Sequence, residues 1–136
     1  MGNVYAELTI RNAGDLIMAR KGHLNENNVR ETVVNAMVDT GAWTLVIGEK
    51  IREQLGLELR GEDWVTLANG ITETAKIVDP VEVQWKNRKM ICQPIMIPTT
   101  EEVLLGAIPL EDMDLIVDPR KEELTGRHGD KIIRRL

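Results

Sequence analysis

The stretch VVNAMVDTGA, residues 33–42, decides the fold of this chain. Its first six residues are mostly β-branched or apolar, which predicts a strand, and this strand runs directly into Asp39. Thr40, Gly41 and Ala42 follow, and the glycine lets the chain turn tightly after the strand. The stretch therefore predicts a carboxylate presented on a tight loop at the end of an apolar strand.

The rest of the chain predicts short β-strands separated by turns. Alternating apolar and polar residues, or short apolar runs, are typical of strands, whereas glycine, asparagine and proline favour turns. We expect further strands over residues 4–10, 16–19, 81–85, 89–97 and 115–118. A polar loop is expected over residues 21–28, and its His23 is interpreted as a surface residue rather than a catalytic base.

A hairpin and two short helices complete the predicted elements. Two alternating runs within residues 64–77 flank Asn69-Gly70, and this pair is the strongest short signal for a β-hairpin. Ile47, Ile51 and Leu55 have helical spacing, and Gly56 follows as a helix-ending residue. A second short helix is expected after Gly106. The chain is thus predicted to be mostly β with two short helices.

Length and charge narrow the classes of function. A chain of 136 residues has the usual size of one domain, and its apolar runs are too short to cross a bilayer. Its net charge of -5 has the wrong sign for binding a phosphate backbone. The N-terminus has no basic region followed by an apolar core, so no signal peptide is expected. We expect a cytoplasmic protein with neither nucleic acid nor membrane as a partner.

The residue inventory also excludes several chemistries. The sequence contains no serine, which excludes a serine nucleophile. Cys92 is the only cysteine and lies in an alternating run, where a lone cysteine is usually a small buried hydrophobe. His23 and His128 are the only imidazoles, too few for a multi-histidine metal site. We therefore expect no metal and no organic cofactor.

The order of the motifs carries more information than any one of them. Asp39-Thr40-Gly41 alone is weak evidence, but Gly70 of the predicted hairpin follows Asp39 by 31 positions (70 − 39). Leu104-Leu105-Gly106 ends 67 positions after Asp39 (106 − 39) and precedes a helix. Together these features resemble the retropepsin-like aspartic proteases of clan AA, in particular their prokaryotic, single-domain, homodimeric members. The resemblance covers residues 4–124.

The resemblance implies a closed, mostly β acid-protease barrel over residues 1–126. Residues 127–136 are then a basic C-terminal tail or an interface strand. It implies that Asp39 is the catalytic residue and that Thr40, Gly41 and Ala42 form the active-site loop, with Thr40 bonding across the two-fold axis. Further members of the implied site are the flap residues Ala68, Asn69 and Gly70, and the supporting residues Leu105 and Gly106.

One Asp39 is not sufficient for this chemistry. Two aspartates about 3 Å apart cannot both ionise, which gives one ionised and one protonated carboxyl at moderate pH. A symmetric homodimer would bring two Asp39 side chains together. The expected function is therefore that of an aspartic endopeptidase, with itself and a peptide or protein substrate as partners. The alternative is a non-catalytic peptide-binding or dimerisation module on the same fold.

The chain departs from the retroviral members at two positions. Those members carry an ion pair between an aspartate and an arginine where this sequence has Trp43 and Ala107. Both partners are absent together, so no buried charge is left unpaired. We expect the dimer to be held differently and the substrate pockets near Trp43 to differ.

Overall fold

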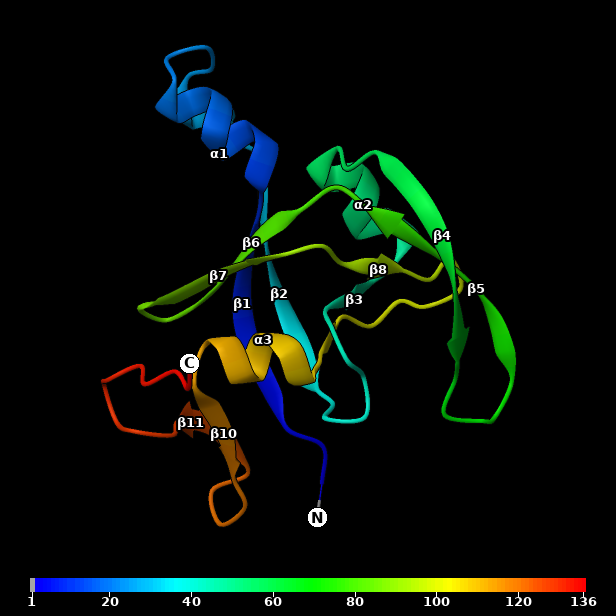
Figure 1. Ribbon diagram of the computed structural model, residues 1–136, viewed down its shortest axis with the longest axis vertical. Helices are drawn as coiled ribbons and strands as arrows, with labels where there is room; N and C mark the ends of the chain where they lie inside the picture. The colour runs from blue at the N-terminus through cyan, green and yellow to red at the C-terminus, as the bar shows by residue number, and fades with distance from the viewer. Residues whose placement is uncertain (1) are drawn as a thin grey trace.

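A curled nine-stranded sheet forms most of the computed structural model, which describes residues 2–136 (Figure 1). The sheet has the order β4-β5-β8-β3-β9-β2-β1-β6-β7. Its strands are β1 (Tyr5–Asn12), β2 (Glu31–Val38), β3 (Val46–Ile47), β4 (Leu59–Thr66), β5 (Thr72–Val78), β6 (Val81–Trp85), β7 (Arg88–Cys92), β8 (Ile95–Met96) and β9 (Leu104–Leu105). β10 (Leu115–Asp118) and β11 (Glu123–Gly126) form a separate antiparallel pair.

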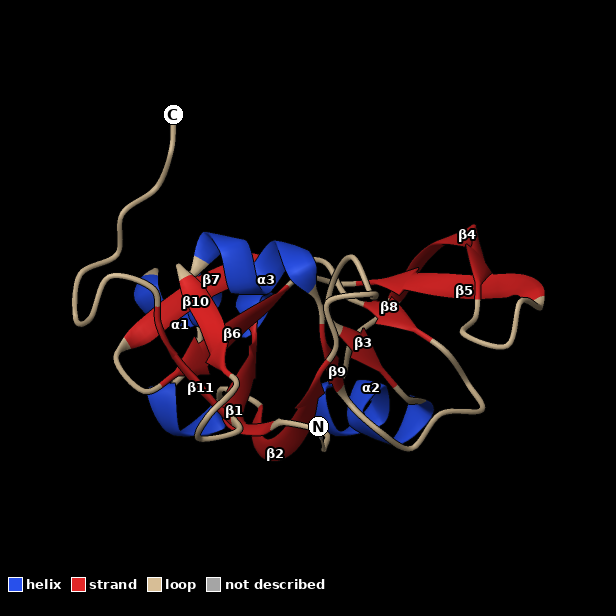
Figure 2. Cartoon of the chain, turned by 90° about the horizontal axis from the view of Figure 1, so that it is seen from below, coloured by secondary structure: helices blue, strands red, loops and turns tan. Residues whose placement is uncertain are grey.

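The sheet curls without closing on itself, because β4 and β7 remain as its two ends. Three helices accompany it: α1 (Ala13–Arg20), α2 (Glu49–Leu55) and α3 (Ala107–Asp112). Figure 2 shows α2 and α3 on opposite sides of the strands. The prediction of a mostly β fold is thus confirmed, and the sheet of the single chain forms a half-barrel rather than a closed barrel.

The core lies inside the curl and follows from the alternation of the strands. Along β1 every second residue is buried, and Leu8 and Ile10 are completely inaccessible to solvent. Ala36 of β2 and Leu105 of β9 are equally buried beside them. Burial of side chains of this size contributes about 1.5–3 kcal/mol each relative to exposure. The strand that leads to Asp39 is therefore anchored to the core through Ala36 and through its pairing with β1 and β9.

The hairpin of β4 and β5 extends away from this core (Figures 1 and 2). It rests on a smaller apolar cluster formed by Val65, Ala75 and Ile95. The turn lies at Asn69-Gly70, as predicted, and Gly70 has a φ of 85°, which favours glycine. The hairpin prediction is confirmed.

Both predicted helices are present. α2 ends at Leu55, and Gly56 follows with a φ of 62°, the left-handed conformation expected after a helix. α3 begins directly after Gly106. The strands predicted over residues 81–85 and 115–118 are present with the same bounds, and those predicted over residues 4–10 and 33–38 are present with slightly shifted ends.

The strand predicted over residues 16–19 is wrong, because these residues belong to α1. The side-chain oxygen of Asn12 accepts a 3.0 Å hydrogen bond from the amide of Asp15 and caps the helix. A run of four apolar residues does not by itself distinguish a strand from a helix. Here the Asn12 cap favours the helix. The predicted polar loop also contains a short 3₁₀ turn, Glu26–Asn28.

The single strand predicted over residues 89–97 is interrupted. Gln93 and Pro94 separate β7, which pairs with β6, from β8, which pairs in parallel with β3. Proline cannot donate to a strand ladder, so the chain changes partners at this point. Among residues 2–136, no helix is both long and apolar enough to span a membrane.

Candidate functional site

The loop that follows β2 holds the Asp39 carboxylate in a fixed orientation. The Asp39 amide donates to the carbonyl of Leu105 at 3.0 Å, which continues the ladder one residue beyond the strand. The chain then turns, and the amide of Gly41 donates to Asp39 Oδ1 at 2.9 Å. The amide of Ala42 donates to the Asp39 carbonyl at 3.1 Å and closes the turn. Oδ1 of Asp39 is therefore hydrogen-bonded within the loop, and Oδ2 takes no part in this bond.

β9 and the residue after it brace this loop from behind. β9 lies between β2 and β3, and Leu105 pairs in parallel with Val38 directly before Asp39. A side chain at Gly106 would overlap the carbonyl of Thr44 and lie 2.6 Å from the carbonyl of Ala42. Only glycine allows so close an approach of the two backbones. The structure thus brings Leu105 and Gly106 against the loop that contains Asp39.

The first turn of α3 completes the support through its backbone. The amide of Ala107 donates to the carbonyl of Ala42, and the amide of Ile108 donates to the carbonyl of Trp43, both at 2.8 Å. These two donors could not be predicted from the sequence, because a backbone hydrogen bond does not require a particular residue type. The only available signal was a glycine placed directly before a predicted helix.

The loop faces solvent in the single chain. Thr40 and Gly41 are exposed, and Asp39 is half-buried. Two large apolar side chains beside the loop are also exposed, Trp43 by 47% and Ile108 by 49%. Exposed apolar side chains of this size, next to a loop with a fixed carboxylate, are typical of a contact surface.

The hairpin tip has the geometry of a tight, exposed turn. Gly70 donates to the carbonyl of Leu67 at 2.9 Å, and Asn69 Oδ1 accepts from the amide of Ile71 at 3.0 Å. Ala68, Asn69 and Gly70 are all exposed. In Figure 1 this tip and the turn after β2, in cyan, lie toward the same lower side of the molecule. The tip is therefore exposed and lies outside the main core.

Cys92 does not have the properties of a nucleophile. It is half-buried on β7, and burial raises the pKa of its thiol to about 12. A thiol with this pKa stays protonated at neutral pH, and the thiolate is the reactive form. His23 is exposed on its loop. Within the described part of the chain, no three His, Cys, Asp or Glu side chains are grouped as metal ligands would be.

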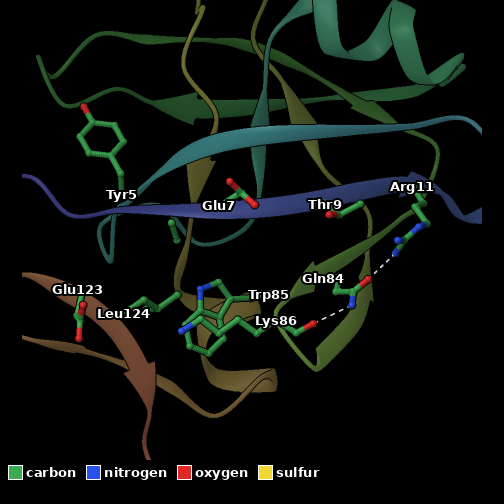
Figure 3. A pocket seen from close by; sticks show the side chains of 10 residues that line it. Tyr5, Glu7, Thr9, Arg11, Gln84, Trp85, Lys86, Glu123 and Leu124 are labelled. Atoms are coloured by element: carbon green, nitrogen blue, oxygen red, sulfur yellow. Dashed lines mark hydrogen bonds between the residues drawn. The ribbon is translucent and has the colours of Figure 1, made fainter.

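A hollow of about 470 Å³ lies along β1 and the end of β6, away from the residues of the Asp39 loop (Figure 3). Four of the ten residues that line it interact with one another. Arg11 donates to Gln84 at 2.7 Å, Gln84 donates to the carbonyl of Lys86 at 2.7 Å, and the Lys86 ammonium lies 4.7 Å from the centre of the Trp85 ring. No residue of the Asp39 loop or of the hairpin tip lines the hollow, so it does not extend the candidate site.

A strand ending in Asp-Thr-Gly, braced by a Leu-Leu-Gly strand and accompanied by a glycine-tipped hairpin, defines an aspartyl protease-like protein. Comparison with protein families agrees: the model of the gag-polyprotein putative aspartyl protease family matches residues 22–112. The chain belongs to this family of retropepsin-like aspartyl proteases.

One solved structure with the same fold is the retroviral protease-like domain of Ddi1 from Leishmania major. It is similar with a TM-score of 0.56 and 18% sequence identity, over 97% of this chain and 91% of that chain. No curated protein sequence showed significant similarity to this chain.

Proposed function

We propose that this chain is an aspartic endopeptidase that acts as a homodimer. The observation that carries the proposal is the Asp39 carboxylate, fixed at the end of β2 by the Gly41 amide at 2.9 Å and presented on an exposed loop. Membership of the aspartyl protease family supports the same reading of this loop.

The proposed site needs a second copy of the chain. A single carboxylate cannot serve as general base and general acid at once, whereas two that share one proton can. A two-fold axis beside the loop would pair Asp39 with Asp39 of the partner subunit, and two-fold dimers are the commonest oligomers. The exposed side chains of Trp43 and Ile108 flank the loop and supply apolar surface for such a contact.

In the proposed mechanism the two carboxyls divide the work. The ionised one removes a proton from water, which attacks the carbonyl carbon of the peptide bond. The protonated one donates to the carbonyl oxygen and then helps to protonate the departing nitrogen. The hairpin tip at Asn69-Gly70 would close over an extended substrate and offer backbone hydrogen bonds to it.

The retroviral ion pair is absent from this loop. Trp43 and Ala107 stand at those positions, and the loop is instead braced by main-chain bonds from Ala107 and Ile108. Main-chain bonds of this kind do not depend on charge. We therefore propose that the chain keeps the catalytic loop of the family with a different subunit contact and different substrate pockets.

The decisive experiment is cleavage of a mixed peptide library at several pH values by the wild type and by Asp39→Asn. The amide has the same shape but cannot take a proton from water, so cleavage should disappear while the folded circular dichroism spectrum is retained. Asp118→Asn is the matched control, because Asp118 also accepts a backbone amide, from Arg120 at 3.0 Å, but belongs to β10.

The outcomes separate the proposal from its alternative. Cleavage by both the wild type and Asp118→Asn, and none by Asp39→Asn, supports the endopeptidase. Cleavage retained by Asp39→Asn removes Asp39 from the mechanism. Peptide binding without cleavage by the wild type at any pH would make the chain a non-catalytic binding or dimerisation module.

A further inference from the structure

α3 is held at both ends, and only its first end touches the Asp39 loop. At its start, the amides of Ala107 and Ile108 donate to the loop carbonyls of Ala42 and Trp43. At its other end the chain meets a group that we call the C-terminal clasp, which consists of Arg88, Asp114, Arg127, His128 and Ile133. The clasp connects β7, the end of α3 and the segment that follows β11.

The Asp114 carboxylate is the centre of the clasp. Its side chain is only 5% exposed. Oδ2 contacts His128 Nδ1 at 2.6 Å and accepts from the amide of Ile133 at 3.0 Å, while Oδ1 lies 3.5 Å from Arg127 Nε. The hydrogen bond to His128, followed by that from Ile133, lowers the pKa of this carboxyl below its usual value. The Asp114 carboxylate is therefore an anion at neutral pH. It contacts the segment after β11 at Arg127, His128 and Ile133.

Arg88 binds the same region from the sheet side. Its side chain belongs to the fully buried residues of the core, and it donates to the carbonyls of Met113 at 2.7 Å and Asp114 at 2.9 Å. It also donates to the carbonyl of Gly129. A buried guanidinium that satisfies several carbonyls is costly to disturb, so the end of α3 is tied to β7.

Asp114 follows Met113, the residue that caps the end of α3, and its backbone is left-handed. Asp114 has a φ of 55°. Residues other than glycine, asparagine and aspartate rarely adopt this backbone conformation. The segment that follows β11 passes beside α3 (Figure 2), and a hollow of about 960 Å³ lies between them. Polar contacts therefore attach this segment, namely those at Asp114 and the bond from Arg88 to Gly129. Arg134 also donates to the carbonyl of Asp112 at 3.0 Å.

We propose that Asp114 is a positioning residue for the Asp39 loop and acts through α3. The helix has six residues, which corresponds to a length of about 9 Å, and so short an element moves as one body. Without the contacts of the Asp114 carboxylate, the side-chain bonds that remain directly after α3 are those from Arg88. The helix can then shift, and its first turn moves relative to Ala42 and Trp43. This inference rests on the proposed function in one respect only, that the positioned loop is the catalytic one.

Amide hydrogen exchange tests the proposal without any need for activity. The variant is Asp114→Asn, because asparagine tolerates the left-handed backbone but offers one acceptor oxygen and adds a donor. Asp118→Asn is the matched control. The amides of Ala107 and Ile108 report on the first turn of α3, and the amide of Ile133 reports on the clasp. The amide of Ile97, bonded to Ile47 at 3.0 Å, reports on the sheet.

In Asp114→Asn, exchange at Ile133, Ala107 and Ile108 should become at least several-fold faster, with Ile97 at its wild-type rate. Faster exchange at Ile133 alone would overturn the proposal, since the clasp would then hold only the segment. Equal acceleration at Ala107, Ile108 and Ile97 would also overturn it, because the effect would then be a general loss of stability.

A second variant keeps the test decisive if Asp114→Asn does not fold. His128→Ala removes one donor from a side chain that is 42% exposed, so folding should be retained. It should accelerate exchange at the same three amides to a smaller extent, and unchanged exchange at Ala107 and Ile108 would overturn the proposal. Where peptide cleavage is detected, both variants should lower kcat and leave KM close to its wild-type value. A raised KM with unchanged kcat would contradict a positioning role.

Discussion

The amide of Ala107 donates a 2.8 Å hydrogen bond to the carbonyl of Ala42, so α3 begins directly against the loop that presents Asp39. The contact uses only main-chain atoms and needs no particular side chain at either position. This explains how an alanine can stand at residue 107, where the retroviral members carry an arginine. The shape of the loop is set by backbone spacing, and Gly106 provides that spacing.

Gly106→Ala should therefore damage both stability and the site. The added Cβ would overlap the carbonyl of Thr44 and lie 2.6 Å from that of Ala42, both of them backbone atoms that cannot move aside easily. Overpacking of this kind costs about 1–3 kcal/mol of unfolding free energy. Urea denaturation should show this loss, whereas Gly61→Ala, which meets no atom within 4 Å, should change stability by less than about 0.5 kcal/mol. Equal stability of the two variants would show that the loop yields to the side chain.

Peptidase activity should depend on protein concentration. If each site takes one Asp39 from each of two chains, dilution below the dimer dissociation constant removes the site by mass action. Specific activity should fall on dilution, in parallel with the fraction of dimer measured by analytical ultracentrifugation. Unchanged specific activity in a sample shown to be monomeric would contradict a shared site.

Cleavage should have a bell-shaped dependence on pH. The two Asp39 carboxyls would titrate as a coupled pair, and the active form holds one proton between them. Below the lower apparent pKa of the pair the base is protonated, and above the upper one both carboxyls are ionised and repel each other. Measurement of kcat/KM from acid to neutral pH checks this. A rate that stays level throughout would argue against proton sharing.

The pair of Asp15 and Arg30 should contribute to stability in a predictable pH range. Arg30 donates to Asp15 at 2.8 and 2.9 Å, and these hydrogen bonds lower the pKa of Asp15 below its usual value of 3.8. The folded state therefore gains stability above pH 3.8 and loses it as the pH falls through the lowered pKa.

Asp15→Asn should lower the unfolding free energy at pH 7 by about 2 kcal/mol, since hydrogen bonds to a charged group are lost. The difference between variant and wild type should shrink at acid pH. Chemical denaturation of both proteins at pH 7 and near pH 3 measures this. If the two proteins differed in unfolding free energy by the same amount at both pH values, the ionised carboxylate of Asp15 would add nothing to stability.

Local sequence patterns predicted the parts of the fold that depend on neighbouring residues. The strand into Asp39, the turn at Gly70 and the helix that ends at Gly56 each carry a signal within a few positions. The order of Asp39-Thr40-Gly41, the hairpin and Leu105-Gly106 then indicated the family, because these short motifs occur in one arrangement. Most residues of the candidate site could therefore be predicted from local sequence patterns.

The features that could not be predicted depend on contacts between distant segments. The strand predicted over residues 16–19 is a separate case with a local cause, because Asn12 favours a turn as well as a helix cap, and here it caps α1 through the amide of Asp15. The interruption at Pro94 reflects the pairing of β8 with β3, far away in the sequence. The clasp at Asp114 joins residues from three separate regions, and no spacing rule connects them. Backbone donors such as Ala107 become visible only when the fold is known.

The segment that contains α1 forms an arm between β1 and β2, set apart from the turn after β2 (Figure 1). Its base is closed by the pairing of Arg11 with Glu31, so the two ends of the arm already lie side by side. The arm can thus serve as a handle: a tag, a fluorescent label or a surface anchor placed at its exposed residue Met18 would report on the molecule, or hold it, without touching the sheet that carries Asp39.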